Sequence, residues 1–327
     1  MILNIVLFVV GLLMLYYGAE WLVKGSSSLA RSLGLSPVVI GLTVVAFGTS
    51  APELVVSVIS SLKDKSMIAV GNVVGSNICN IALVLGLAAL FQPLTAHRSV
   101  VRRDIPIMLG ISVYLLLLTF DSRLGRFEGA TLFAGIILYT FFNYYLAMRE
   151  AKGNPGGAVA VAEDAEQIEF VTSRSRQIVL ILAGIVGVVW GAEILIDAAV
   201  KIMKVLGVGE KFIGLTIVAF GTSLPELATS VVAAIRKEMD ISIGNLVGSN
   251  VFNIMSVLGV ASMVRPIPIP GGFVESGLLV DYCVMMATSL MPWIMMRKTN
   301  TVTRLDGVIL LASYVGYIVY LVTVRAI

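Results

Sequence analysis

Long apolar stretches alternate with short polar breaks along nearly the whole chain. Most of them approach the roughly 20 residues that an α-helix needs to cross the hydrocarbon core of a membrane. No basic segment precedes the first stretch, so we interpret it as a retained helix rather than a cleaved signal peptide. The pattern predicts ten membrane-spanning helices, near residues 4–23, 38–60, 67–91, 105–120, 129–147, 177–197, 212–235, 241–263, 281–296 and 305–324.

The composition agrees with a membrane protein and excludes an ordinary soluble enzyme. Of the 327 residues, 58% are hydrophobic and 13% are charged, whereas a soluble domain carries about 25% charged residues. The 23 basic residues form no dense cluster, so no nucleic acid partner is expected. Two cysteines and one histidine provide neither a disulfide framework nor a zinc site. We expect no cofactor and no obligatory protein partner.

The distribution of lysine and arginine predicts the orientation, because cytoplasmic loops carry an excess of these residues. Placing the N-terminus outside puts fourteen of the 23 basic residues inside, so both termini are expected outside. The one long polar break, residues 150–176, is rich in glycine and acidic side chains. We expect it to be a cytoplasmic linker.

The chain contains an internal duplication at a constant offset of 173 residues. Residues 40–63 and 213–236 are identical at 15 of 24 positions, and residues 71–90 and 244–263 at 12 of 20. The identities include Gly, Thr, Ser, Pro and Glu, which chance similarity between apolar helices would not produce. The duplication divides the chain into a first five-helix repeat, a linker and a second five-helix repeat, at residues 1–149, 150–176 and 177–327.

The repeats are expected to cross the membrane in opposite directions, because an offset of five helices is odd. Inverted repeats are typical of secondary transporters, which bind their substrates near the midplane at the repeat interface. The predicted fold class is therefore an all-α membrane protein with about ten transmembrane helices in two inverted-topology five-helix repeats.

Polar side chains recur inside the predicted second, third, seventh and eighth spans. An ionised acid at a helix centre costs roughly 2.5 to 3.5 kcal/mol, so Glu53 and Glu226 require a compensating role. Hydroxyl and amide side chains share the helix faces of these acids or recur in the neighbouring spans. The paired polar residues are Thr49, Ser50, Glu53, Asn72, Ser76, Asn77 and Asn80 in the first repeat, with Thr222, Ser223, Glu226, Asn245, Ser249, Asn250 and Asn253 in the second.

Other repeated polar residues allow more than one interpretation. Asn72 and Asn245 are either ion ligands or partners in interhelical hydrogen bonds. Glu20 and Glu193 are expected near helix ends, where an acid anchors or gates rather than binds an ion directly.

The candidate site consists of oxygen ligands only. Pro52 and Pro225 lack an N–H group and so free carbonyl oxygens one turn upstream. Carboxylate, amide, hydroxyl and carbonyl oxygens suit hard cations, and an irregular cage rich in protein ligands favours calcium and sodium over magnesium. Two carboxylates balance one divalent ion or two sodium ions, which gives a physical basis for exchange at one shared site.

The paired GTSxPEL and GNxxGSNxxN blocks resemble the two alpha-repeats of the sodium/calcium exchanger family, prokaryotic type, within the cation/calcium exchanger superfamily. The resemblance implies an antiporter of the prokaryotic plasma (inner) membrane that expels Ca²⁺ by admitting Na⁺. It implies as ion ligands the carbonyls of Ala46 and Ala219 and ten side chains, those of Thr49, Ser50, Glu53, Ser76, Asn80, Thr222, Ser223, Glu226, Ser249 and Asn253. Prokaryotic exchangers of this type can carry an Asp where Asn253 stands, so this site has one fewer titratable group.

We therefore predict a secondary antiporter that exchanges sodium for calcium by alternating access, with the two ions and the lipid bilayer as its partners. The alternatives are calcium/proton or other cation antiport and, in a different class, a passive cation channel. An enzyme is not expected, because no GxSxG or GxGD motif occurs and the lone His97 lies in a loop.

Overall fold

The computed structural model describes residues 1–63, 65–153, 170–206, 219–269 and 276–325. The first half forms α1 (Ile2–Ser32), α2 (Pro37–Ile40), the π-helical turn η1 (Gly41–Val45), α3 (Ala46–Thr49), α4 (Ala51–Leu62), α5 (Ser66–Ile78), η2 (Cys79–Leu85), α6 (Gly86–Phe91), η3 (Val100–Asp104), α7 (Ile105–Leu118) and α8 (Arg126–Gly153). The second half forms α10 (Arg174–Val205), α12 (Ala219–Gly221), α13 (Leu224–Ile235), α14 (Met239–Phe252), η5 (Asn253–Leu258), α15 (Gly259–Val264), α17 (Leu278–Thr299), α18 (Arg304–Tyr320) and η6 (Leu321–Arg325).

Helices dominate because the apolar stretches satisfy their backbone hydrogen bonds internally, as a membrane requires. Seven helices of the described residues are long and apolar enough to cross a membrane, and the bent pair formed by residues 37–49 and 51–62 allows an eighth. The predicted stretch 105–120 corresponds to the shorter helix α7. Of the stretch 212–235, residues 212–218 lie outside the described part of the chain, and the rest contains α12 and α13. The count of ten spans stays a prediction, as does the opposite orientation of the repeats.

Two small antiparallel strand pairs join loops from the two halves. Strand β1 (Leu94–Thr95) pairs with β4 (Thr301–Val302), and β2 (Arg123–Leu124) pairs with β3 (Ile267–Pro268). Leu94 lies opposite Val302, and Leu124 lies opposite Ile267. These pairings add short strands to the predicted all-α fold and tie the ends of the helices together.

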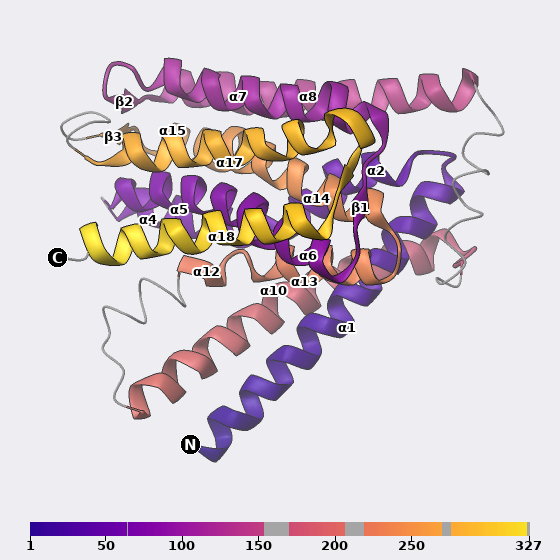
Figure 1. The fold of residues 1–327 in the computed structure, drawn as a ribbon, viewed down its shortest axis with the longest axis horizontal. Coiled ribbons are helices and arrows are strands. Elements are labelled where there is room, and N and C mark those ends of the chain that lie inside the picture. Colours follow the sequence, from indigo (N-terminus) through magenta and orange to yellow (C-terminus); the bar gives the residue numbers. More distant parts are fainter. Residues whose placement is uncertain (64, 154–169, 207–218, 270–275, 326–327) are drawn as a thin grey trace.

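Helices α1 and α10 lie side by side and extend obliquely from the stack of the other helices (Figure 1). Small residues allow their backbones to approach closely. A Cβ atom added at Gly18 would lie 2.7 Å from the backbone nitrogen of Val188, so only glycine fits there. One buried apolar cluster joins this helix pair to residues of α2, α13 and α14, while a second, larger cluster fills the stack.

The predicted boundaries differ from the structure in two instructive places. Helix α1 continues to Ser32 and α10 spans Arg174–Val205, so Glu20 and Glu193 lie within helices. The prediction that they lie near helix ends is wrong, because the polar Ser-rich segment after residue 24 still packs as helix. Of the predicted linker 150–176, residues 154–169 lie outside the described part of the chain.

Candidate functional site

The two repeated GTSxPEL segments each interrupt a helix at their serine. Ser50 has φ −82° and ψ 6°, and Ser223 has φ −87° and ψ 5°, so neither continues the α-helix. The flanking helical segments in the first repeat meet at an angle of 44°. Pro52 and Pro225 stand in the first turn of the helix that follows, where a missing N–H group costs little. The same sequence therefore produces the same broken helix in both halves.

Glu53 and Glu226 lie in the first turns of α4 and α13, and both side chains are completely buried. The N-terminal end of a helix favours negative charge, which stabilises carboxylates at these positions. Within the described part of the chain, neither acid forms an ion pair with a basic side chain. Two unpaired buried acids within electrostatic range of each other thus form the centre of the site.

Hydroxyl groups from both halves surround the two acids. Ser76 donates to Oε1 of Glu53 at 3.4 Å. Oε1 of Glu226 accepts from Ser249 at 3.4 Å and from Ser50, which belongs to the other repeat, at 3.2 Å. The hydrogen bond between Ser50 and Glu226 joins the two repeats, in agreement with a site at the repeat interface.

Threonine and asparagine side chains extend this shared network. The hydroxyl of Thr49 donates to Oδ1 of Asn245 at 3.1 Å, and that of Thr222 donates to Oδ1 of Asn72 at 3.4 Å. The Asn72 amide donates in turn to the carbonyl of Glu53 at 3.3 Å. Asn72 and Asn245 thus act as interhelical hydrogen-bond partners, which was one of their two predicted roles.

Two further asparagines fix the amides of Asn80 and Asn253. The Nδ2 group of Asn80 donates to Oδ1 of Asn250 at 3.1 Å, and that of Asn253 donates to Oδ1 of Asn77 at 3.0 Å. Asn77 and Asn250 also each donate to the other's backbone carbonyl, at 3.2 and 3.3 Å. With their amide nitrogens held in this way, Asn80 and Asn253 keep their Oδ1 atoms free.

Helix irregularities position these amides. Asn80 is the second residue of the π-helical turn η2, and Asn253 is the first residue of η5. Single π-helical turns inside α-helices are frequent at functional sites, because the wider turn shifts a side chain and its backbone carbonyls out of the regular register.

The site contains several buried oxygen atoms that have no hydrogen-bond partner. Buried polar atoms are nearly always satisfied, so a group of unsatisfied ones needs an explanation. All of these atoms are acceptors or hydroxyls and suit a hard cation. They are Oε2 of Glu53, Oε2 of Glu226, Oδ1 of Asn80, Oδ1 of Asn253 and Oγ of Ser223.

The other donor sets that bind metals in proteins are not evident here. Among the described residues, no three His, Cys, Asp or Glu side chains lie close enough together to bind one metal ion. Nitrogen and sulfur ligands select zinc or copper, whereas carboxylate, amide and hydroxyl oxygens select calcium, sodium or magnesium. The geometry therefore suits a hard cation held mainly by neutral oxygens and two carboxylates.

Most hydrogen bonds of the site follow a two-fold pseudosymmetry. The bond from Ser50 to Glu226 is an exception, because the hydroxyl of the counterpart Ser223 has no hydrogen-bond partner. The bond from Ser76 to Glu53 has its counterpart 173 residues further on, from Ser249 to Glu226. The same holds for the pair of bonds that Thr49 and Thr222 make and for those that Asn80 and Asn253 make. The two copies of the repeated sequence thus form two similar hydrogen-bond networks, and bonds between the repeats connect them.

Hydrogen bonds connect most of the predicted side chains. Ser50 and Ser249 bond to Glu226, Ser76 bonds to Glu53, and Thr49, Thr222, Asn80 and Asn253 bond to other asparagines of the two repeats, whereas the Ser223 hydroxyl has no hydrogen-bond partner. The carbonyl of Ala46 is adjacent but already accepts from Ser50 N at 3.0 Å and from the Thr49 hydroxyl at 3.4 Å. Ala219 begins α12 directly after a gap in the described residues, so its carbonyl stays a prediction. Asn77 and Asn250 are among the repeated polar residues of the sequence, but the ligand set that the family resemblance implies omits them.

Comparison with known proteins gives the same picture along the whole chain. The chain matches the family described as "Sodium/calcium exchanger protein" over residues 3–145 and 176–323. It is 36% identical to the putative antiporter CaxA of Alkalimonas amylolytica, over 94% of this chain and 95% of that protein. It is 32% identical to the sodium/calcium exchanger MaX1 of Methanosarcina acetivorans, over 97% and 98% of the two chains.

A solved structure of the sodium-calcium exchanger NCX_Mj, soaked with Na⁺ and Ca²⁺, has the same overall arrangement. It superposes with a TM-score of 0.82 at 32% sequence identity and covers 99% of both chains. Together with the family match over most of the sequence, this similarity shows that the chain is a membrane cation transporter and belongs to the sodium/calcium exchanger family.

Proposed function

We propose that the protein is an antiporter that exchanges Na⁺ for Ca²⁺ at the site between its repeats. The observation that carries this proposal is the group of buried, unpartnered oxygens around Glu53 and Glu226. The names of the relatives MaX1 and NCX_Mj, both sodium/calcium exchangers, support the choice of ions.

The charge of the site supports exchange at one shared position. Two carboxylates are neutralised by one Ca²⁺ or by two Na⁺, so either load relieves the cost of burying both acids. The proposed ligands are the ten predicted side chains, together with the carbonyls of Ala46 and Ala219. Asn253 contributes a neutral oxygen, which leaves the charge of the ligand set at minus two.

We further propose alternating access, with the pair α1 and α10 moving against the helix stack. This pair has its own apolar cluster and lies oblique to the stack (Figure 1). It also contacts the break regions, because a Cβ atom added at Gly48 would lie 2.6 Å from Ile185, and one added at Gly221 would lie 2.5 Å from Ile196. A shift of α10 would therefore change the packing of Ile185 against Gly48 and of Ile196 against Gly221, next to the two helix breaks.

The repeats are proposed to have inverted topology, with both termini outside a prokaryotic inner membrane. If more than two Na⁺ enter for each Ca²⁺, the transport moves net charge. The membrane potential then contributes about 2.3 kcal/mol per charge per 100 mV. Calcium/proton antiport is the alternative, because Glu53 and Glu226 can each bind a proton instead of a sodium ion.

The decisive experiment measures uptake of radiolabelled calcium into proteoliposomes loaded with sodium. Uptake should require the outward sodium gradient and should not occur with a proton gradient alone. Glu53→Gln removes one buried charge opposite the ion, a loss of about 3–5 kcal/mol, so uptake should fall by about 100-fold or more. Asp121→Asn is the control and should leave uptake unchanged, because Asp121 is an exposed acid outside the site and outside α1 and α10.

Three results would contradict the proposal. Full uptake in Glu53→Gln, with the protein folded and inserted, would remove the site assignment. Uptake driven by a proton gradient and indifferent to sodium would keep the site and change the coupling ion. Counter-ion-independent calcium flux would instead indicate a channel.

A further inference from the structure

A basic pocket lies far from the candidate ion site, at one end of the helix stack. It has a volume of about 570 Å³, which is within the range of small-ligand sites. The residues that line it are Arg98, Val101, Arg102, Pro106, Trp293, Arg297, Lys298 and Asn300. It forms where the loop before α7 meets the end of α17, and the pairing of β1 with β4 holds these two segments together.

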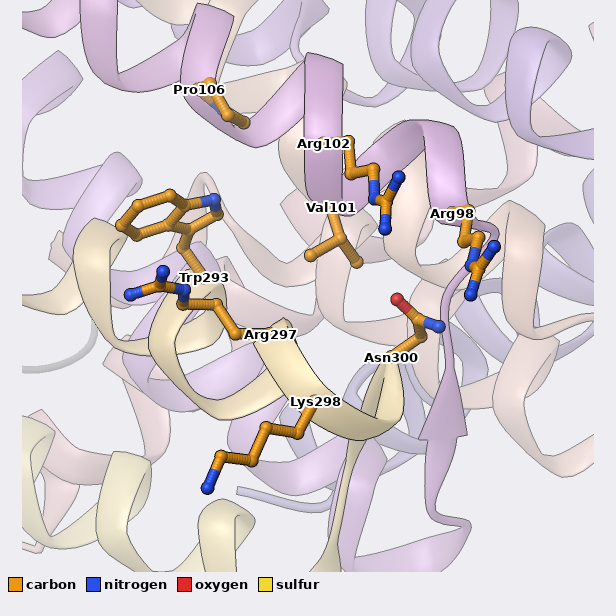
Figure 2. A pocket seen from close by; sticks show the side chains of 8 residues that line it. All are labelled: Arg98, Val101, Arg102, Pro106, Trp293, Arg297, Lys298 and Asn300. Carbon is orange, nitrogen blue, oxygen red and sulfur yellow. The ribbon is translucent and has the colours of Figure 1, made fainter.

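Figure 2 shows how the lining side chains are arranged. Arg98 and Arg102 extend from the upper segment into the gap toward Asn300, on the opposite wall. Arg297 lies over the ring of Trp293, with its guanidinium carbon 4.9 Å from the ring centroid. Lys298 points away from the two upper arginines. The pocket thus has a cationic wall at one side and an aromatic floor at the other.

The positive charge of the pocket is not neutralised by the protein. In the described part of the chain, its four basic side chains form no ion pair with an acid. The neighbouring Arg103 provides the contrast, because it pairs with the buried Asp104 at 2.9 Å and also donates to Asn143 at 3.2 Å. A basic cluster without acids inside the protein attracts an anion from outside.

The position of the pocket points to a lipid. Helix α17 is an apolar candidate membrane span, and the pocket lies at its C-terminal end, where basic and tryptophan side chains mark the membrane interface. Leu290 and Ile294 precede Lys298 at helical spacing on α17 and are 38% and 57% exposed. They form an exposed apolar track on α17 that leads to the lining residue Lys298, and an acyl chain covers a track of this kind.

We propose that this pocket binds the phosphate headgroup of an anionic phospholipid. Arg98, Arg102 and Asn300 contact the phosphate, and Trp293 with the apolar track on α17 contacts the glycerol and acyl chain. The sequence predicts this end of the molecule on the cytoplasmic side, where the leaflet rich in anionic lipids lies. The proposal is independent of which ions the protein exchanges.

The test uses the full-length protein, purified in neutral detergent and stripped of lipid. Phosphatidylglycerol is titrated into it, with phosphatidylcholine and inorganic phosphate as separate arms, and the rise in melting temperature gives an apparent Kd. Phosphatidylglycerol should bind and the other two should not. Arg98→Gln/Arg102→Gln should weaken binding about 25-fold, because each basic side chain near an anionic lipid contributes about fivefold, or about 1 kcal/mol.

Control variants separate charge from folding. Lys63→Gln/Arg126→Gln removes two exposed charges outside the pocket and should bind as the wild type does. Arg98→Lys/Arg102→Lys keeps the charge and should retain most of the binding. If the Gln pair does not fold, Arg102→Gln alone should bind about fivefold more weakly.

Three results would overturn the proposal. The first is equal affinity of the wild type and the folded Gln variant for phosphatidylglycerol. The second is equal binding of phosphatidylcholine, since this would mean that headgroup charge does not matter. The third is displacement of the lipid by inorganic phosphate at similar concentrations, which would assign the pocket to a free phosphate.

Discussion

At the scale of single residues, the site depends on how neutral amides are oriented. An asparagine side chain has a carbonyl oxygen that accepts and an NH₂ group that donates, and only the oxygen can bind a cation. The orientation of the amide therefore decides whether the residue can be a ligand. Asn77 and Asn250 accept the amide N–H groups of Asn253 and Asn80, which fixes these two amides and leaves their oxygens buried without a hydrogen-bond partner. Asn77 and Asn250 are therefore positioning residues.

Asn77→Ala tests this role. The substitution removes the oxygen that accepts from the Asn253 amide, which is then free to rotate, and it removes the donor to the backbone carbonyl of Asn250. We expect the calcium KM to rise about 10-fold to 100-fold, as for other residues that orient metal ligands. The measurement is the concentration dependence of calcium uptake in proteoliposomes.

The matched control is Asn143→Ala. Asn143 is also buried, but it bonds to the carbonyl of Tyr139 and to Arg103, outside the site. Its loss should lower stability without changing KM. An unchanged KM in Asn77→Ala, or an equal change in both variants, would show that Asn77 has only a structural role.

At the scale of elements, close glycine contacts join α1 to α10. Without a hydrophobic driving force between helices in lipid, such pairs associate through tight packing of small residues. Gly11 and Gly18 of α1 meet Gly191 and Gly187 of α10, and each would clash with the partner backbone if it carried a Cβ atom. The pair is thereby expected to behave as one rigid element.

Gly18→Ala should disrupt this contact. Its Cβ would lie 2.7 Å from Val188 N and 2.8 Å from the carbonyl carbon of Gly187, and backbone atoms cannot rotate away. We expect a loss of about 1–3 kcal/mol in the free energy of unfolding, typical of overpacking. The measurement is the melting temperature of the purified protein in detergent.

Gly110→Ala in α7 is the control, since nothing lies within 4 Å of its added Cβ. Both substitutions gain the same helix propensity, so the difference between them isolates the clash. A Gly18→Ala protein as stable as Gly110→Ala would mean that α1 and α10 are not closely packed in the membrane.

At the scale of the whole molecule, charged groups fasten the α1 and α10 pair to the stack. The carboxylate of Glu238, which precedes α14, accepts from Ser27 at 2.5 Å and from Arg31 at 2.8 Å, both on α1. Arg236, just after α13, pairs with Glu20 of α1. If α1 moves during transport, these bonds have to open or move with it.

A double-mutant cycle at Arg31 and Glu238 measures this attachment. Glu238 is buried, so Arg31→Gln leaves its charge without a cation and should cost about 3–5 kcal/mol of stability. Arg31→Gln/Glu238→Gln should cost less than the sum of the two single changes, by about 0.5–3 kcal/mol. The measurement is thermal unfolding, with calcium uptake recorded for each variant.

The exposed pair of Lys201 and Asp197 provides the comparison, since such i,i+4 surface pairs contribute little. Its cycle should show a coupling of about 0.3–0.5 kcal/mol at most. Strict additivity at Arg31 and Glu238 would mean that their contact does not hold α1 to the stack.

Much of the site could be predicted because its chemistry is local and duplicated. Buried acids, hydroxyls and amides stand out in apolar helices, and the 173-residue offset identifies which of them matter together. The roles of Asn77 and Asn250 could not be predicted, since each acts on a side chain in the other repeat. The ends of α1 were misjudged because polarity alone does not stop a helix that packs against neighbours.

The sequence by itself determined the apolar helices, the duplication and the ligand types, because hydrophobic periodicity, identity at a fixed offset and side-chain chemistry are all properties of the chain. Only the tertiary structure decided which oxygens are free and how the basic pocket forms. Hydrogen bonds between the repeats orient the amides. The pairing of β1 with β4 brings residues some 200 positions apart to one pocket. Contacts between distant segments depend on how helices pack, which no local pattern encodes.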